Sequence, residues 1–533
     1  MKKLVCFTIA LALAAGLVFT GCGSQKSSGT TFTIALSEDI DAVDPGRAWD
    51  YVTNQVTNQI TEGLVTFDAN NNIVPELAKS WRQADDLTYI YDVRDDIVFS
   101  DGSKMTMNDV LFSFERAKDP EGGTYFADYY SDVESFSVNG WQLTIKLSKP
   151  SAVFKFIPAT GAGRIISKAY YEKHKDDFGS PKGGIVATGP FAYQSWTSGR
   201  EIILKKNAKY WNKEKLAANI VDTLVFRIIP EDTSRVIALQ TGSADFCVNV
   251  PVDMLDQLAS ADNLNLTSVP SNHLTYLALN TERLPTSDVN VRRAISRAID
   301  LGEFQRQILK TAGTAGTVLP FGSSSYGADA AKWQQFLNTT QGYTLDIAAA
   351  QRHLAASGYP NGFTCDLIVS ENSLANQRAL FIQESLKAIN INVNIKRMSG
   401  DEQDTYQVGN VRDANGKRDY DMLIGGWEGD YPDLNGMIEV MFSSSQAGED
   451  GYNAAAYAKP EIDALLESQR TTIDPDKRFE ILSRMMTTIV SDVPYIVVDY
   501  SSRHSVLNKK YTGLAVTASW LWVLPVQNVR TVN

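Results

Sequence analysis

The sequence is poor in the residues that build metal sites and disulfide frameworks. It has four cysteines and four histidines in 533 residues, and only Cys247 and Cys365 lie beyond position 22. No cysteines or histidines have the spacing of metal ligands, so neither a structural metal nor another cofactor is expected. Both cysteines stand in apolar runs typical of buried strands, although an exported location would also permit a disulfide between them.

Basic residues and long apolar runs are also scarce. The formal net charge is −12, which argues against a nucleic-acid partner and against a basic membrane-docking face. Apart from the N-terminal stretch, no run is long and apolar enough to cross a bilayer. The remaining chain of about 500 residues is too long for one core, so two or three lobes are expected.

The N-terminal stretch has the pattern of a secretory signal. Lys2 and Lys3 precede an apolar run over residues 4–19, and a small-residue site ends at Cys22. The cysteine makes this segment resemble the bacterial lipoprotein signal, in which the thiol is acylated and becomes the mature N-terminus. We therefore expect a signal peptide at 1–22, a flexible tether at 23–30, and a lipid anchor on the outer face of the cytoplasmic membrane. An ordinary cleaved signal is the alternative.

Helical and strand patterns alternate along the rest of the chain. Period-two and apolar runs predict strands at 31–36, 87–93, 141–147, 274–279, 364–368, 392–396, 421–424 and 495–498. Periodic segments predict helices at 51–64, 107–117, 374–389, 461–469 and 478–489. This spacing indicates a mixed α/β or α+β fold of several lobes.

Five blocks in a fixed order carry a family resemblance. They are EGL at 62–64 with PELAKSW at 75–81; VFSDG at 98–102 with DVLFSF at 109–114; TGPF at 188–191 with KNAKYW at 206–211; DVNVRRAI at 288–295; and GWEGDYPD at 426–433. Together they resemble the large solute-binding proteins of bacterial ABC importers, the oligopeptide- and dipeptide-binding family.

The resemblance implies a periplasmic-binding-protein fold of type II with three lobes. Lobe I would be discontinuous, comprising 31–69, 187–276 and 493–533. Lobe II would be inserted at 70–186, and lobe III would cover 277–492. A ligand cleft would lie between lobes I and III, and a hinge would lie near Tyr276 and Val497.

The last block supplies the strongest candidate for ligand binding. In peptide-binding members the aspartate of this block, here Asp430, pairs with the ligand's α-ammonium. An ammonium that leaves water inside a closed cleft needs such a fixed anion. The alternative is an aspartate that caps the turn before Pro432. Trp427 would form a flat wall beside the ligand, or anchor the loop from the core, and Glu428 and Gly429 could offer backbone groups to an extended peptide.

Further candidates come from the opposite side of the predicted cleft. The loop that contains Asp50 and Tyr51 falls where family members touch the ligand, although Tyr51 could simply begin a helix. Tyr276, at the predicted hinge, is also a candidate, and Arg378 lies near where dipeptide-binding members hold the ligand carboxylate, or is a solvated residue at a helix start. Tyr125 and Tyr129 belong to an aromatic stretch of lobe II, where surface packing is the simpler explanation.

These features predict a binding protein rather than an enzyme. The expected role is to capture di- and oligopeptides and to deliver them, as a monomer, to the membrane subunits of an ABC permease. The same fold could instead bind an oligosaccharide, a nickel complex or an opine, because fold does not fix the ligand. A secreted hydrolase is a more distant alternative, since the sequence contains no nucleophile elbow and no phosphate-binding glycine loop.

Overall fold

The computed structural model describes residues 29–532, except 249, 341, 515 and 517–523. The expected signal peptide, Cys22 and most of the tether lie outside the described residues. Within the described residues, no helix is long and apolar enough to cross a membrane.

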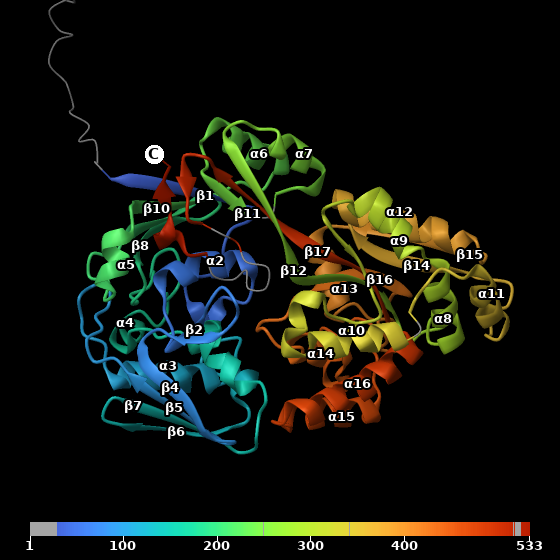
Figure 1. Ribbon diagram of the computed structural model, residues 1–533, viewed down its shortest axis with the longest axis horizontal. Coiled ribbons are helices and arrows are strands. Elements are labelled where there is room, and N and C mark those ends of the chain that lie inside the picture. Colours follow the sequence, from blue (N-terminus) through green and yellow to red (C-terminus); the bar gives the residue numbers. More distant parts are fainter. Residues whose placement is uncertain (1–28, 249, 341, 515, 517–523, 533) are drawn as a thin grey trace, which may run out of the picture.

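A mixed sheet of eleven strands runs through the molecule (Figure 1). Its main path is β15-β14-β16-β12-β17-β11-β1-β10-β9-β8, and β13 also pairs with β17. In that order the strands are Ile391–Met398, Phe363–Ser370, Met422–Trp427, Leu264–Leu279, Tyr495–Asn508, Phe246–Val248, Thr30–Leu36, Val221–Ile228, Glu201–Lys206 and Phe191–Thr197, with β13 at Gly313–Ala315. The β1/β10, β1/β11, β14/β15 and β14/β16 pairs are parallel.

The β8 half of this sheet, with its helices, forms what we call lobe I. Its helices are α2 (Tyr51–Ile60), α5 (Lys213–Ala218), α6 (Asp232–Thr241) and α7 (Leu255–Ala259). The helix α4 (Lys168–Lys173) lies in the range predicted for lobe II, but its residues Tyr170 and Tyr171 pack against the lobe I core. One apolar core contains Phe32, Ile34 and residues of α2, while a second contains Ala35 and residues of α6 and α7. Alternate residues of β1 thus face opposite layers, as the pleat of a strand requires.

A separate antiparallel sheet organises lobe II. Its order is β4-β5-β7-β6, with the strands Ala78–Asp85, Thr88–Val93, Gln142–Leu147 and Val133–Asn139. The helix α3 (Met107–Lys118) packs in the same core. It begins with a capping box, because Thr106 Oγ1 accepts from Asp109 N and the Asp109 carboxylate accepts from Thr106 N. A short pair, β2 (Val65–Phe67) and β3 (Ile73–Pro75), joins lobe II to lobe I.

The β15 half of the large sheet forms lobe III, with helices on both faces. One core contains residues of α8 (Val289–Ala298), α9 (Leu301–Phe304), α11 (Ile347–Ala355) and α12 (Ser373–Lys387). The opposite core contains residues of α10 (Ala330–Thr339), α14 (Asn435–Phe442), α15 (Pro460–Thr471) and α16 (Pro475–Asp492). The remaining elements are α13 (Gly400–Gln407), which follows β15, and the C-terminal pair β18 (Tyr511–Thr512) and β19 (Arg530–Thr531).

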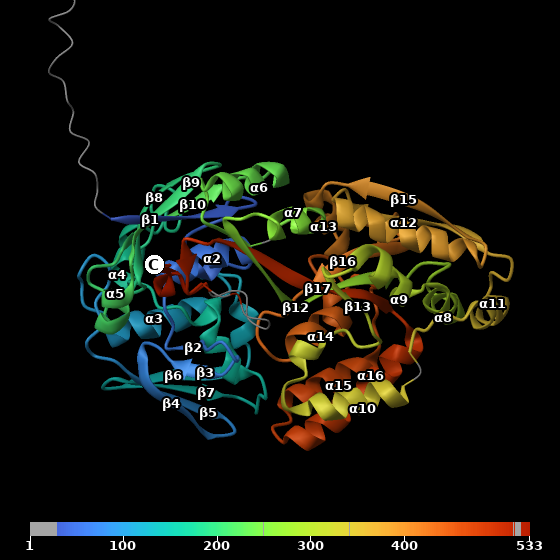
Figure 2. The same cartoon turned by 45° about the horizontal axis from the view of Figure 1, so that its top comes forward.

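Two long strands connect lobes I and III. The antiparallel strands β12 and β17 pair from Leu264 with Asn508 to Ala278 with Tyr495, and the pair crosses between the two halves of the molecule (Figure 2). The register places Tyr276 opposite Val497, the two residues of the predicted hinge, beside an irregularity at Thr275. That this crossover acts as a hinge remains a prediction, as do the exact lobe boundaries.

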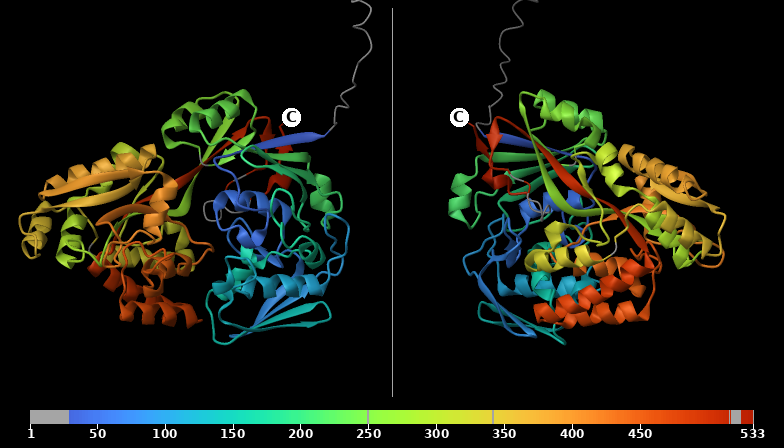
Figure 3. Two further views of the ribbon diagram at one scale, coloured as in Figure 1. Left: turned by 180° about the vertical axis from the view of Figure 1, so that it is seen from behind. Right: turned by 45° about the vertical axis from the view of Figure 1, so that its right-hand side comes forward.

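Lobes II and III also touch each other directly. Arg470 pairs with Asp132, Lys149 Nζ lies 2.6 Å from Glu467 Oε1, and the Ala152 amide donates to the Arg470 carbonyl at 2.8 Å. The helix α15 accordingly approaches the lobe II loops in the views of Figure 3.

The sheets and the helices that cover them confirm the predicted mixed α/β fold. Cys247 and Cys365 are free and buried in different cores.

Candidate ligand-binding site

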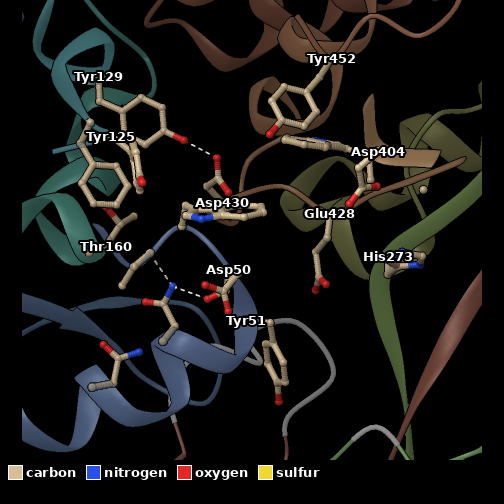
Figure 4. Close-up of a pocket in the computed structure, with 18 of the residues that line it drawn as sticks. Asp50, Tyr51, Tyr125, Tyr129, Thr160, His273, Asp404, Glu428, Asp430 and Tyr452 are labelled. Carbon is tan, nitrogen blue, oxygen red and sulfur yellow. Dashed lines mark hydrogen bonds between the residues drawn. The ribbon is translucent and has the colours of Figure 1, made fainter. Parts of the chain in front are cut away.

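A cavity of about 690 Å³ opens where the three lobes meet (Figure 4). This volume is typical of small-ligand sites. It is lined by Ala48, Trp49, Asp50, Tyr51, Asn54, Asn58, Tyr125, Phe126, Tyr129, Ala159, Thr160, Gly161, Arg164, His273, Asp404, Gln407, Val408, Gly426, Trp427, Glu428, Asp430 and Tyr452. Five of the residues predicted from the sequence are present: Asp50, Tyr51, Trp427, Glu428 and Asp430.

Asp430 lies in the loop between β16 and α14, at the boundary between lobes II and III. Its Oδ2 accepts a hydrogen bond from the Tyr129 hydroxyl of lobe II. Burial raises the pKa of Asp430 to about 6, although the Tyr129 hydrogen bond acts in the opposite direction. The carboxylate has no cationic partner among the described residues. It is therefore a desolvated anion on the wall of a cavity.

The residues before Asp430 have different environments. The Trp427 Nε1 donates to the Gly436 carbonyl at 2.8 Å, and its ring lies 5.1 Å from the Tyr452 ring, so it is both an anchor of the loop and a wall of the cavity. The Glu428 carboxylate pairs with Arg503 of β17. Gly429 is not among the lining residues, because its Cα packs against Gly436.

Lobe I contributes the start of α2. Asp50 is the N-cap of this helix, and its Oδ1 accepts from the Thr53 amide at 2.7 Å. Burial raises the pKa of Asp50. Tyr51 begins the helix and lines the cavity at the same time, with the Arg503 guanidinium 4.5 Å from its ring centre. Trp49 exposes 51% of its surface, while its Nε1 donates to Asp41 at 2.9 Å.

Two of the predicted ligand-binding residues lie away from the cavity. Tyr276 is 1% exposed and packs in the lobe III core, where its ring meets the Tyr495 ring edge-on at 4.9 Å. Arg378 is held inside lobe III by Asp499, with Nε–Oδ2 and Nη2–Oδ1 distances of 2.7 and 2.9 Å. Neither side chain is placed to touch a ligand in this arrangement.

Several lining residues were not expected from the sequence. Asp404 of α13 and Tyr452 stand in segments without any recognised motif, and His273 is an isolated histidine. Burial, then the charges of Arg503 and Arg378, lower the pKa of His273 to about 3, so the imidazole is neutral. Tyr125 and Tyr129, for which surface packing is the simpler explanation from sequence, both line the cavity.

The chemistry of this lining suits a ligand with positive charge and apolar surface. Aromatic rings from all three lobes offer flat apolar surface and cation–π faces. Carboxylates outnumber cationic groups, and Arg164, a lining cation, is paired with Glu76 at 3.3 Å. The described residues contain no cluster of three potential metal ligands.

Comparison with known proteins identifies the family. The model for bacterial extracellular solute-binding proteins, family 5 Middle, matches residues 72–449. The glutathione-binding protein GsiB of Salmonella typhi is 26% identical over 515 residues, which is 96% of each chain.

Solved structures share the fold. DppA of Helicobacter pylori, in complex with the peptide STSA, has a TM-score of 0.79 at 24% identity, over 94% of this chain and 98% of its own. NikA of Staphylococcus aureus, in complex with Ni(L-His)2, has a TM-score of 0.74 at 20% identity, over 93% of this chain and 99% of its own. The family model covers well over half of the sequence, and the chain therefore belongs to the family 5 extracellular solute-binding proteins of bacterial ABC importers.

Proposed function

We propose that the protein captures short peptides in the cavity between its lobes and delivers them to the membrane subunits of an ABC permease. The observation that carries the proposal is the buried carboxylate of Asp430, which has no cationic partner within the described part of the chain and can bind the α-ammonium of a peptide. The loop 427–430 would offer backbone groups to the peptide chain, and the aromatic walls would contact its side chains without strong selection. The ligands of two similar proteins, glutathione for GsiB of Salmonella typhi and the peptide STSA for DppA of Helicobacter pylori, are consistent with this cargo.

Anchoring at Cys22 completes the proposal. An acylated cysteine followed by the polar segment 23–30 would hold the protein at the outer face of the cytoplasmic membrane, within reach of a permease. The protein would act as a non-enzymatic monomer there.

Calorimetry with trialanine and N-acetyl-trialanine tests the role of Asp430. The substitution Asp430→Asn keeps the shape but removes the charge, and loss of one partner of a buried charge pair costs about 2–5 kcal/mol. We expect trialanine to bind the variant roughly 30-fold to several-thousand-fold more weakly. Acetylation should weaken binding to the unmodified protein similarly, yet hardly weaken binding to the variant, because both changes remove the same interaction.

Asp128→Asn is the matched control. This exposed residue lies next to Tyr129, does not line the cavity, and loses the same charge. Equal binding of acetylated and free trialanine to the unmodified protein would reject Asp430 as an amine anchor. The cargo would then be a solute without an amine, such as an oligosaccharide.

A further inference from the structure

Residues from four of the family blocks meet at one buried point, the junction of lobes I and II. Glu62 follows α2 of lobe I, and its backbone carbonyl accepts from the amide of Ile165, which packs in the lobe II core, at 2.9 Å. The other three blocks contribute Glu76, Thr188, Tyr210 and Trp211. The proposed function uses none of these side chains, so the junction calls for a separate explanation.

The Glu62 carboxyl group is surrounded by neutral hydrogen-bond donors. The residue is 3% exposed. Its Oε1 accepts from the Tyr210 hydroxyl at 2.8 Å, and its Oε2 accepts from the Trp211 indole at 2.9 Å. No ion pair between described residues involves Glu62. Because a carboxylate without a cation is costly to bury, such a group takes up a proton.

The nearest guanidinium already has a partner. Arg164 Nη1 lies 3.3 Å from Glu76 Oε2, and the charge of Glu76 acts on Glu62. The other charged groups near the pair are Lys215 of α5, which acts on Glu76, and Arg94, whose guanidinium lies 4.5 Å from the Trp211 ring centre. If both glutamates were ionised, Arg164 would face two carboxylates, and one of them would stay uncompensated.

A proton on Glu62 fits the surrounding contacts. Burial, and then the charge of Glu76, raise the pKa of Glu62 to about 8, although its hydrogen bonds act in the opposite direction. In the protonated group one oxygen still accepts from Trp211, while the carboxyl hydrogen and the Tyr210 hydroxyl can exchange donor and acceptor roles. Protonation thus removes the repulsion between the glutamates and leaves Glu76 to Arg164.

We infer that Glu62 is a neutral carboxylic acid at pH 7, and that its proton holds lobes I and II together. The adjacent Gly63 amide donates to Glu76 Oε2 at 2.8 Å, so the backbone beside Glu62 is tied to the second carboxylate. Arg164 and residues 159–161 of lobe II line the cavity, and ionisation of Glu62 would therefore disturb the cavity wall. The inference holds whichever ligand the cavity binds.

Infrared spectroscopy tests the proton directly, because a protonated carboxyl group and a carboxylate have different carbonyl stretches. We expect a protonated-carboxyl band that is present at pH 7 and lost with a midpoint near pH 8. Glu62→Gln keeps the shape without the titration and should lack this transition. Glu115→Gln, at an exposed position of α3, is the matched control and should retain it. Absence of the transition from the unmodified protein, or its persistence in Glu62→Gln, would overturn the inference.

Folding stability provides a second measurement. Since burial raises the pKa of Glu62, the stability that its proton contributes is fully present below the ordinary value of 4.5 and is lost as the pH rises to about 8. The folding equilibrium constant of the unmodified protein, divided by that of Glu62→Gln, should fall about tenfold per pH unit between about pH 5 and pH 7. Denaturant unfolding at these pH values measures the ratio, and a constant ratio would contradict the inference.

Hydrogen exchange tests the effect on the lobes. After correction for the intrinsic rate, amides of the segments 62–65 and 164–166 should exchange faster at pH 9 than at pH 7 in the unmodified protein, but not in Glu62→Gln. Exchange that is equally fast at both pH values would show that the proton does not hold the lobes together.

Tyr210→Phe keeps the inference testable if Glu62→Gln does not fold. The substitution removes a hydroxyl that donates to Glu62 and therefore favours its ionised form. The infrared transition should accordingly move to higher pH, and an unshifted transition would mean that another group carries the proton.

Discussion

Tyr431 provides the sharpest test of whether contact between lobes II and III controls ligand binding. It follows Asp430 in the lobe III loop, yet it is 7% exposed and packs in the lobe II core. Its ring is stacked on Phe156 with a centroid distance of 6.1 Å, and meets the Tyr129 ring edge-on at 6.2 Å. Separation of the two lobes would expose this ring to water.

The substitution Tyr431→Ala should therefore favour the open form. Burial of one aromatic side chain is worth about 1.5–3 kcal/mol, and we take about 2–3 kcal/mol because two ring contacts are also lost. Since 1.4 kcal/mol corresponds to a tenfold change, the closed form becomes about 30- to 150-fold less populated. The apparent affinity of any ligand that requires closure falls by up to the same factor.

Calorimetry with trialanine measures this loss, and small-angle scattering of the ligand-free protein should show a larger radius of gyration for the variant. Tyr431→Phe is the matched control, because it keeps the ring and removes only the hydroxyl that accepts from Asn435 within lobe III at 2.9 Å. If the alanine variant is folded by circular dichroism and still binds with unchanged affinity, the contact between the lobes does not govern binding.

Three further predictions concern charge and anchoring. Because the pKa of Asp430 is raised to about 6, peptide affinity should fall as the pH drops below about 6. Without ligand, the effect of pH on stability has the opposite sign, because the folded protein holds this proton more tightly than the unfolded chain does. The stability that this proton contributes near pH 4 is therefore lost as the pH rises to about 6, and thermal melts would detect the loss. Arg378→Met should lower the free energy of unfolding by about 3–5 kcal/mol, because it leaves Asp499 buried and unpaired, while calorimetry on the folded variant should show unchanged peptide affinity. Cys22→Ser should abolish labelling by fatty acid and release the protein from membranes, and a variant that fractionates wholly with the membrane would contradict the lipoprotein signal.

Local sequence patterns were sufficient for many secondary-structure elements. The helix predicted at 107–117 is found at Met107–Lys118, and that at 478–489 lies within Pro475–Asp492. The strands predicted at 274–279 and 495–498 are instead the ends of two much longer strands, Leu264–Leu279 and Tyr495–Asn508. The parts that were not predicted are mostly polar and include Pro270, so alternation is weak there, and it is their mutual pairing across the molecule that makes them strands.

The residues of the candidate site show the same contrast between local sequence patterns and contacts between distant segments. Asp430, Trp427 and Glu428 stand together in one contiguous block of the sequence, and the structure places all three at the cavity wall, although their role in ligand binding stays a prediction. Asp404 was not predicted, because nothing local distinguishes it from the other acids of a polar helix; only the approach of lobe I makes it part of a cavity.

Arg378 shows why charge is the hardest property of a site to predict from sequence. Its position near a helix start was compatible with a ligand carboxylate or with solvent, yet the guanidinium is neutralised by Asp499, 121 residues away. The register of β17 decides that pairing, and the sequence reveals the register only once the partner strands are known. Glu428 is neutralised by Arg503 of the same strand, whereas Asp50, Asp404 and Asp430 form no ion pair with any residue that the structure describes. The charges that a ligand would meet therefore depend less on which charged residues the chain contains than on which of them the fold leaves uncompensated at the cavity wall.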